Sequence, residues 1–358
     1  MSASIDFSTL TLNKEEARSS SELIFKKAFS SPLLEQTHDV QTGIDMDRYI
    51  PIFGNLDLAA KLSAGDCSSN VDAQQIPVSQ KLWEPKLHSF RIVHCEEQVP
   101  DLLKFWKKSM IAANIWEAVD SEMIAFIETK VLEQLDRNII TIADFADKTH
   151  SPVGDATGNQ LLTVGKTKTL LNTINGMWSQ IFTDGAGAKK MYRYVINENT
   201  LANKKAQDTL PADAALTMLR SMYNNIAPEA FDYPNLTFQI TRSLFNNWQD
   251  FMEDKSLVFM LNRTEEGSTV FSYRGIPIVV RKDWDRVIRG WFDLGTTYYY
   301  PHRAILAPLS VIPVGTSDTE SLSKFSSIYD PVTKKHYIDV AFKLDMKVLL
   351  EDVMAVAY

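Results

Sequence analysis

The most constraining feature of the sequence is a long run of alternating residues near its C-terminal end. In residues 338–348, every second side chain from Ile338 onward is large and apolar, and polar or small residues stand between them. This period of two predicts a β-strand with one buried face. At roughly 3.3 Å per residue the strand would extend about 36 Å, whereas a typical strand has roughly 5–6 residues. Such a strand indicates an elongated body rather than a compact globule.

Three segments have the residue spacing of amphipathic helices. The clearest is residues 101–137, where apolar side chains recur every three or four positions in the second half and a proline with an aspartate stands at the start. Two further helices are expected at about residues 213–225 and 241–253, because their apolar positions also lie three or four apart.

Other segments are expected to contain strands. The isoleucines and the phenylalanine in residues 139–145 indicate strand material, followed by a loop-rich stretch up to residue 175. Residues 257–315 are expected to form sheet with turns, and residues 271–280 predict two strands joined by a tight turn centred on Gly275. Helices and strands together predict an α+β protein.

Residues 80–98 have strand character and are flanked by loop-like stretches. His88, Phe90, Ile92 and His94 would share one face of the strand. The segment also carries four bulky apolar side chains, which are Leu82, Trp83, Leu87 and Phe90. Because a two-stranded excursion is only marginally stable alone, these side chains need a surface to bury against, on this subunit or on a neighbour.

The composition is that of an ordinary folded protein. The chain has 358 residues, of which 45% are hydrophobic and 23% are charged. Because a typical domain has roughly 100–200 residues, this length predicts two or three domains or lobes. With 37 Lys+Arg and 45 Asp+Glu, the net charge is -8, which argues against a general nucleic-acid binder. The sequence has no apolar run of the roughly 20 residues that span a bilayer. Only Cys67 and Cys95 are present, which excludes a disulfide framework and indicates a reducing cytosol.

Sequence motifs for catalysis or nucleotide binding are absent or incomplete. Gly165, Lys166 and Thr167 resemble the end of a phosphate-binding loop, but the preceding glycine, Gly158, lies too far away for the motif. The sequence contains neither a nucleophile-elbow pattern nor a zinc-protease pattern. We therefore expect no nucleotide site.

Two groups of side chains have the chemistry of metal ligands. They are His88, His94 and Cys95 in one group and Asp144, Asp147 and Asp155 in the other. Cys95 would point away from the two histidines, and carboxylates in a polar loop are normally solvated, so we expect neither group to hold a metal. The sequence predicts no enzyme and no cofactor.

From about Ile50 onward, several stretches follow one another in a distinctive order. They are residues 81–86, 91–95, 135–138, 174–178, 241–253, 271–278 and 353–357, together with the long alternating strand. This order resembles the major capsid proteins of tailed bacteriophages, most closely those of crAss-like phages that infect Bacteroidetes.

The resemblance implies the tailed-phage major capsid fold, which encapsulins share. Its implied parts are an N-terminal arm (1–49), an extended two-stranded loop (50–100), a peripheral domain with the long helix (101–174), an axial domain (175–320) and a closing strand that returns to the peripheral domain (321–358). In such a shell, four side chains would be buried on an adjacent subunit, namely Leu82, Trp83, Leu87 and Phe90.

The resemblance also implies a function. The chain would self-assemble, as hexamers and pentamers, into the icosahedral head around a double-stranded DNA genome. Its partners would be other copies of itself, scaffolding, portal and decoration proteins, and packaged DNA in weak, non-specific contact, with no membrane involved. It would be made in the host cytoplasm and located in the virion. Two alternatives are an encapsulin-like nanocompartment and, in a different class, a soluble metal-dependent enzyme that uses the acidic loop at 144–155.

Overall fold

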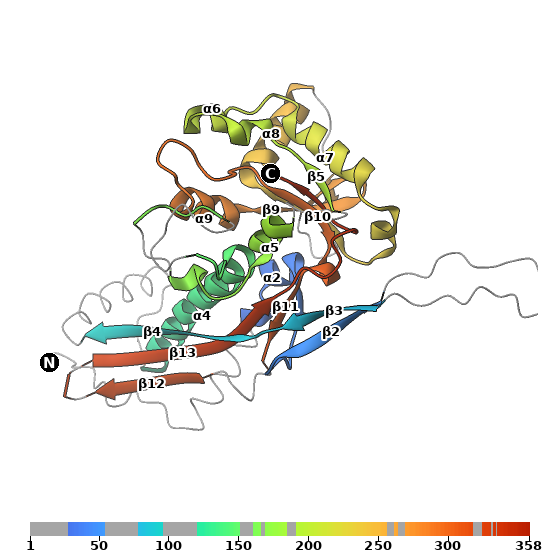
Figure 1. The fold of residues 1–358 in the computed structure, drawn as a ribbon. Helices are drawn as coiled ribbons and strands as arrows, with labels where there is room; N and C mark the ends of the chain where they lie inside the picture. The colour runs from blue at the N-terminus through green and yellow to red at the C-terminus, as the bar shows by residue number, and fades with distance from the viewer. Residues whose placement is uncertain are drawn as a thin grey trace, which may run out of the picture.

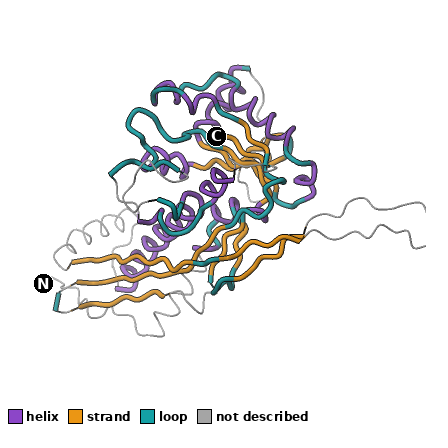
Figure 2. The backbone as a smooth tube through the Cα atoms, viewed as in Figure 1, coloured by secondary structure: helices purple, strands orange, loops and turns teal. Residues whose placement is uncertain are grey.

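The chain folds into two β-sheets, a long helix beside them and a projecting two-stranded ribbon, as a computed structural model shows (Figure 1). The structure describes residues 28–53, 78–95, 120–150, 160–165, 169–184, 191–255, 261–263, 269–317, 324–330, 332–333 and 335–358. The described part is elongated, with a seven-stranded sheet and most helices at one end and a five-stranded sheet at the other (Figure 2).

The helices and strands follow one another along the chain in a mixed order, and four strands in a row come before the long helix. The α-helices are α2 (Pro32–Thr37), α4 (Asp120–Phe145), α5 (Met177–Asp184), α6 (Lys204–Asp208), α7 (Ala214–Asn225), α8 (Arg242–Asp254) and α9 (Lys282–Trp291). Short 3-10 turns are η3 (Thr169–Leu171), η4 (Asn197–Thr200), η5 (Pro228–Asp232) and η6 (Leu309–Val311). The strands are β1 (Asp39–Gln41), β2 (Arg48–Phe53), β3 (Val78–Trp83), β4 (Lys86–Cys95), β5 (Tyr192–Tyr194), β6 (Leu236–Thr241), β7 (Leu261–Arg263), β8 (Thr269–Tyr273), β9 (Ile276–Arg281), β10 (Ala304–Pro308), β11 (Pro313–Thr316), β12 (Lys324–Asp330), β13 (Lys335–Met346) and β14 (Ala355–Ala357).

The five-stranded sheet is built around β13, which has 12 residues. β13 pairs antiparallel with β4 on one side, and with β12 and then β11 on the other, and β1 extends the sheet from β11. The alternating side chains of Ile338, Val340 and Phe342 are buried on the face that packs against α4. The long strand expected from the sequence is therefore confirmed, with slightly different ends.

Helix α4 corrects one expectation about secondary structure. Its 26 residues continue to Phe145, whereas residues 139–145 were expected to form strand. Here the helix is buried on every side, so its sequence has no polar face and resembles a buried strand. Gly176, at the start of α5, approaches α4 so closely that an added β-carbon would lie 2.8 Å from the carbonyl oxygen of Ala143.

The seven-stranded sheet has the order β5-β14-β10-β6-β9-β8-β7 and is accompanied by α7, α8 and α9. The helices expected near 213–225 and 241–253 are present as α7 and α8. The turn between β8 and β9 is also confirmed, since Arg274 (φ 51°) and Gly275 (φ 85°) both occupy the left-handed region that a tight hairpin turn requires. Helix α9 was missed, because the whole stretch 257–315 was expected to be sheet with turns.

The projecting ribbon consists of β2 and β3, which pair from Arg48 opposite Trp83 to Phe53 opposite Val78. The segment 80–98 therefore does not form a two-stranded excursion of its own, and that expectation is wrong. Its first half joins β2, and its second half, β4, pairs with β13 over ten positions. Instead of pairing with each other as a local hairpin, β3 and β4 pair with strands that lie far from them in the sequence.

Candidate assembly surfaces

The four side chains expected at a subunit contact differ in exposure. Leu87 is 61% exposed and points away from the core. Leu82 and Phe90 are half-buried, and Phe90 packs against the core of the same chain. The structure therefore brings only part of this set to the surface.

Trp83 is buried inside its own chain, with 1% of its surface exposed. Its ring lies over β11, where a β-carbon added to Gly315 would come within 2.9 Å of it. A glycine at this position thus makes room for the indole. The expectation that Trp83 is buried on an adjacent subunit is corrected: its removal would test folding rather than assembly.

An apolar row crosses the outer face of the five-stranded sheet, the face that points away from α4. Tyr337 of β13 lies directly opposite Val93 of β4 and Ile328 of β12. Directly opposite residues share one side of an antiparallel sheet, and this side is opposite to that of the buried Ile338. Val93 is 41% and Ile328 52% exposed. We call these three side chains the outer row.

A charged pair lies beside the outer row. Arg91 and Asp339, which are opposite each other on β4 and β13, form an ion pair with Nε 2.5 Å from Oδ1. The Arg91 guanidinium also lies 5.2 Å from the centre of the Tyr337 ring. In the turn that follows β12, Val332 is 89% exposed. Apolar groups bordered by a polar rim are typical of protein-protein contact surfaces.

More exposed apolar side chains lie where the ribbon leaves the body. Met46 and Tyr49 are exposed, and Tyr49 lies opposite Leu82 in the ribbon. Lys343, which is opposite Leu87 in the sheet, donates a hydrogen bond to the carbonyl oxygen of Asp45 at 2.5 Å. This hydrogen bond ties the base of the ribbon to the edge of the outer face.

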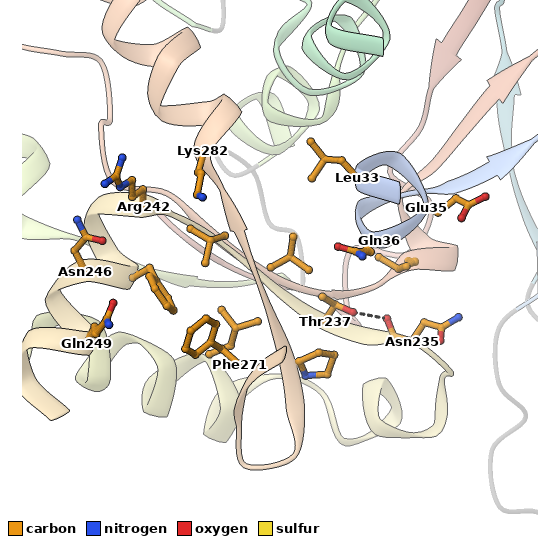
Figure 3. Close-up of a pocket in the computed structure, with 16 residues that line it drawn as sticks. Leu33, Glu35, Gln36, Asn235, Thr237, Arg242, Asn246, Gln249, Phe271 and Lys282 are labelled. Atoms are coloured by element: carbon orange, nitrogen blue, oxygen red, sulfur yellow. Dashed lines mark hydrogen bonds between the residues drawn. The ribbon is translucent and has the colours of Figure 1, made fainter. Parts of the chain in front are cut away.

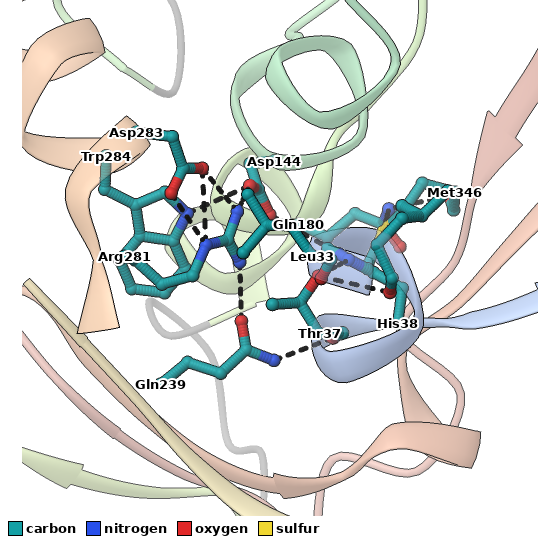
Figure 4. Close-up of polar contacts among 11 residues, drawn as sticks. Leu33, Thr37, His38, Asp144, Gln180, Gln239, Arg281, Asp283, Trp284 and Met346 are labelled. Carbon is teal, nitrogen blue, oxygen red and sulfur yellow. Dashed lines mark hydrogen bonds and ion pairs between the residues drawn. The ribbon is translucent and has the colours of Figure 1, made fainter. Parts of the chain in front are cut away.

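A buried polar junction connects α2, α4 and the seven-stranded sheet (Figure 4). Asp144, at the end of α4, forms an ion pair with Arg281 at the end of β9 and accepts a hydrogen bond from Trp284 Nε1 at 2.9 Å. Arg281 also donates to Gln239 at 2.6 Å, and Gln239 donates to the carbonyl oxygen of Thr37 at 2.7 Å. The junction thereby connects the end of α2 to β6 of the seven-stranded sheet, and through Arg281 to the end of α4.

Asp144 is charged despite complete burial. Burial by itself would raise its pKa, but the adjacent Arg281 guanidinium and the contacts from His38 and Trp284 outweigh that effect and lower the pKa. His38 Nε2 lies 3.4 Å from Asp144 Oδ1, longer than a well-formed hydrogen bond. Because the Asp144 carboxylate is buried and already bound by Arg281 and Trp284, we assign it a role in stabilising the fold.

A second buried arginine, Arg303, lies in an aromatic box with the rings of Trp178 and Phe182 at 4.9 and 5.1 Å. Its guanidinium donates to the carbonyl oxygens of Tyr300 at 2.9 Å and Tyr299 at 3.0 Å. Carbonyl oxygens and ring faces thus surround a cation that burial would otherwise destabilise.

Those residues considered for metal binding whose side chains the structure describes make separate contacts. His88 stacks on Phe342 at 5.4 Å, and burial lowers its pKa to about 4. The side chains of His94 and Cys95 lie outside the described residues. Asp144 belongs to the junction, and Asp147 accepts a hydrogen bond from the Thr149 hydroxyl at 2.5 Å. The expectation of solvated carboxylates is therefore wrong for Asp144 and for Asp147, because both side chains are buried.

Four other residues that the sequence analysis considers lie outside the described residues. They are Asp155, Gly158, Lys166 and Thr167. In the ranges that the structure describes, no three side chains with metal-ligand chemistry gather at one point. Nor does any helix in those ranges combine the length and apolar character needed to cross a membrane.

Sequence reasoning missed most members of both regions. Tyr337 and Ile328 could have been found only with the pairing of β12, β13 and β4, because the sequence shows alternation but not register. Arg281 and Gln239 belong to no recognisable sequence motif, and only their burial in the structure identifies them as members of the junction. Leu87, which the sequence analysis singles out, is exposed, and its role in a subunit contact stays a prediction.

The fold is that of phage capsid proteins. One solved structure that resembles this chain is the satellite phage P4 procapsid including the size determination (Sid) protein, with a TM-score of 0.50, 12% identity, and coverage of 94% of this chain and 98% of that chain. Another is the capsid of an empty GTA particle, with a TM-score of 0.52, 10% identity, and coverage of 92% and 90%. No family model and no curated protein sequence matches this chain.

Proposed function

We propose that this chain is the major capsid protein of a tailed phage and self-assembles into the icosahedral shell around its DNA. The observation that carries the proposal is the fold, which corresponds over nearly the whole chain to proteins solved as a procapsid and a capsid. The outer row supports it, because exposed apolar side chains next to a polar rim suit contacts between copies. The role is structural rather than enzymatic.

The finer points of the proposal come from the sequence resemblance. They are assembly as hexamers and pentamers, a virion location after synthesis in the host cytoplasm, membership of the crAss-like group, and scaffolding, portal and decoration partners. We retain the division into an arm, an extended loop, a peripheral domain, an axial domain and a closing strand. The net charge of -8 fits only weak, non-specific contact with packaged DNA.

Electron microscopy of the expressed full chain tests the proposal. We expect closed particles, and many weak contacts would hold them together through multivalency. The variant Ile328→Asp places a charge in the outer row and should leave folded chains but few particles. The matched variant Ile328→Leu keeps the apolar contact and should assemble normally.

Two results would overturn parts of this proposal. If concentrated protein stays monomeric under all assembly conditions, the shell function is wrong. If Ile328→Asp assembles as well as Ile328→Leu, the outer row is not a subunit contact. A shell that forms around an enzyme instead of a genome would favour the nanocompartment, as would a neighbouring cargo gene in place of terminase and portal genes.

A further inference from the structure

A groove opens in the seven-stranded sheet where β8 and β9 separate (Figure 3). The two strands pair only from Phe271 opposite Ile278 to Tyr273 opposite Ile276. Beyond this point β9 continues through Val279 and Val280 with β6 on one side, and among the described residues no strand pairs with its other side. The cavity there has a volume of about 890 Å³. We call it the β9 groove.

The floor of the β9 groove is apolar. Half-buried side chains form it on both faces of the sheet around the edge of β9: Pro277 and Val279 lie on one face, and Phe271 and Val280 lie on the other, while Leu33 comes from α2. Such a floor accepts apolar side chains of a ligand. A volume of this size is within the range of ordinary ligand-binding sites, which is roughly 300–1,000 Å³.

One wall of the β9 groove carries polar side chains in a row. Arg242, Asn246 and Gln249 lie on one face of α8, and Lys282 begins α9 at the end of the strand (Figure 3). Within the described ranges, none of these four side chains makes a hydrogen bond or an ion pair. They are thus available to a ligand without the loss of an existing contact.

The charges indicate the kind of ligand. Two cations, Arg242 and Lys282, line the groove with a single carboxylate, Glu35, although the whole chain has a net charge of -8. An open strand edge offers backbone donors and acceptors to a second extended chain. A helix would leave these backbone groups unpaired, so the edge favours a strand.

We propose that the β9 groove binds an extended acidic segment of a partner protein by strand addition. Apolar side chains of the segment would lie on the floor, and its carboxylates would face Arg242 and Lys282. Backbone hydrogen bonds along Val279 and Val280 would give affinity, and the two cations would give preference for acidic segments. The proposal does not depend on the shell function, because the groove lies within one chain.

A synthetic peptide tests the proposal in the full chain. The probe is a fluorescein-labelled peptide of eight residues in which valine and glutamate alternate, and fluorescence anisotropy measures its binding. We expect saturable binding of this probe and none of the peptide with lysine in place of glutamate. N-methylation of alternate backbone nitrogens should weaken binding about ten-fold or more, since each lost hydrogen bond contributes roughly 0.5–1.5 kcal/mol.

Protein variants locate the site. Replacing both groove cations, Arg242→Gln with Lys282→Gln, should weaken binding about three-fold to ten-fold, the effect of losing two exposed ion pairs. The matched control, Arg220→Gln with Lys205→Gln, removes the same charge from exposed positions outside the groove and should leave binding unchanged.

Several results would overturn the proposal. Equal binding of the glutamate and lysine peptides would exclude charge recognition, and equal binding of the N-methylated peptide would exclude strand addition. An equal effect of both double variants would place the probe elsewhere. Binding to dissociated subunits but not to assembled particles would mean that another copy of the chain, not a partner protein, closes the groove.

Discussion

The junction and the outer row differ in what they bury and what they expose. At the junction, Asp144 and Arg281 are completely buried, although charged side chains are rarely found inside proteins unless they are paired. In the outer row, Val93 and Ile328 are about half exposed, although each could have been buried by a further layer of structure. The junction thus shields charged side chains from water, whereas the outer row exposes apolar side chains to water.

The difference shows which region serves the fold of one chain and which is available to others. The junction satisfies its own charges through contacts among α2, α4, β6 and β9, so it needs nothing from outside the chain. In the part of the chain that the structure describes, no element covers the outer row. Stability measurements should therefore respond to the junction, and assembly measurements to the outer row.

The largest expected effect is at the junction. The variant Asp144→Ala leaves the Arg281 guanidinium with Asp283 and Gln239 alone and removes the acceptor for Trp284. Removing one partner of a buried ion pair typically costs about 3–5 kcal/mol. Urea unfolding of dissociated subunits measures the loss of unfolding free energy.

An exposed aspartate provides the control for this variant. Asp232 is exposed, and Asp232→Ala should change the unfolding free energy by less than about 0.5 kcal/mol. A loss for Asp144→Ala no larger than that of Asp232→Ala would contradict the assignment of the junction to the fold of the single chain.

A smaller effect is expected from pH, at a buried group on the inner face of the same sheet as the outer row. Burial lowers the pKa of His88 to about 4. In the unfolded chain the pKa is roughly 6.5. As pH falls from about 6.5 to about 4, His88 binds a proton in the unfolded chain but not in the folded chain. The contribution of His88 to the unfolding free energy is therefore fully present above about pH 6.5 and decreases as the pH falls to about 4.

The variant His88→Leu isolates this contribution from the other histidines. Unfolding curves at several pH values should show that the native chain loses up to about 3 kcal/mol more than the variant between neutral pH and pH 4. Parallel pH dependence in both proteins would mean that folding does not lower the pKa of His88, and the inner face would then tolerate a charge at this position.

The sequence predicted those elements whose pattern is local. The alternation that begins at Ile338 survives in β13, and Gly275 lies in the predicted turn, because both depend on neighbours in the chain. Helix α4 was misread at Ile139 to Phe145, since complete burial removes the polar face that distinguishes a helix. Helix α9 was missed although Trp284, Val287 and Ile288 form its buried stripe, because sheet was expected throughout that region.

The candidate surfaces could be predicted only in part, because they depend on which strands pair. The four bulky side chains in residues 80–98 indicated an apolar surface, but the sequence does not show that Trp83 turns into the chain against Gly315 while Leu87 turns outward. Tyr337, Val93 and Ile328 form a row only through the register of three strands. Burial and register are tertiary properties, and no local motif encodes them.

The smallest expected effect on stability is in the outer row itself, and it tests the comparison most directly. Ile328→Ala removes apolar atoms that are already half in water, so the unfolding free energy of dissociated subunits should change by less than about 0.5 kcal/mol. On the inner face, Phe342→Ala empties a fully buried site and should cost about 3–5 kcal/mol. Both variants change one large apolar residue of adjacent strands to alanine, and they differ chiefly in which face of the sheet loses contact. If Ile328→Ala destabilises the chain as much as Phe342→Ala, the outer face is completed within one copy, and the distinction between a region for folding and a region for assembly is lost.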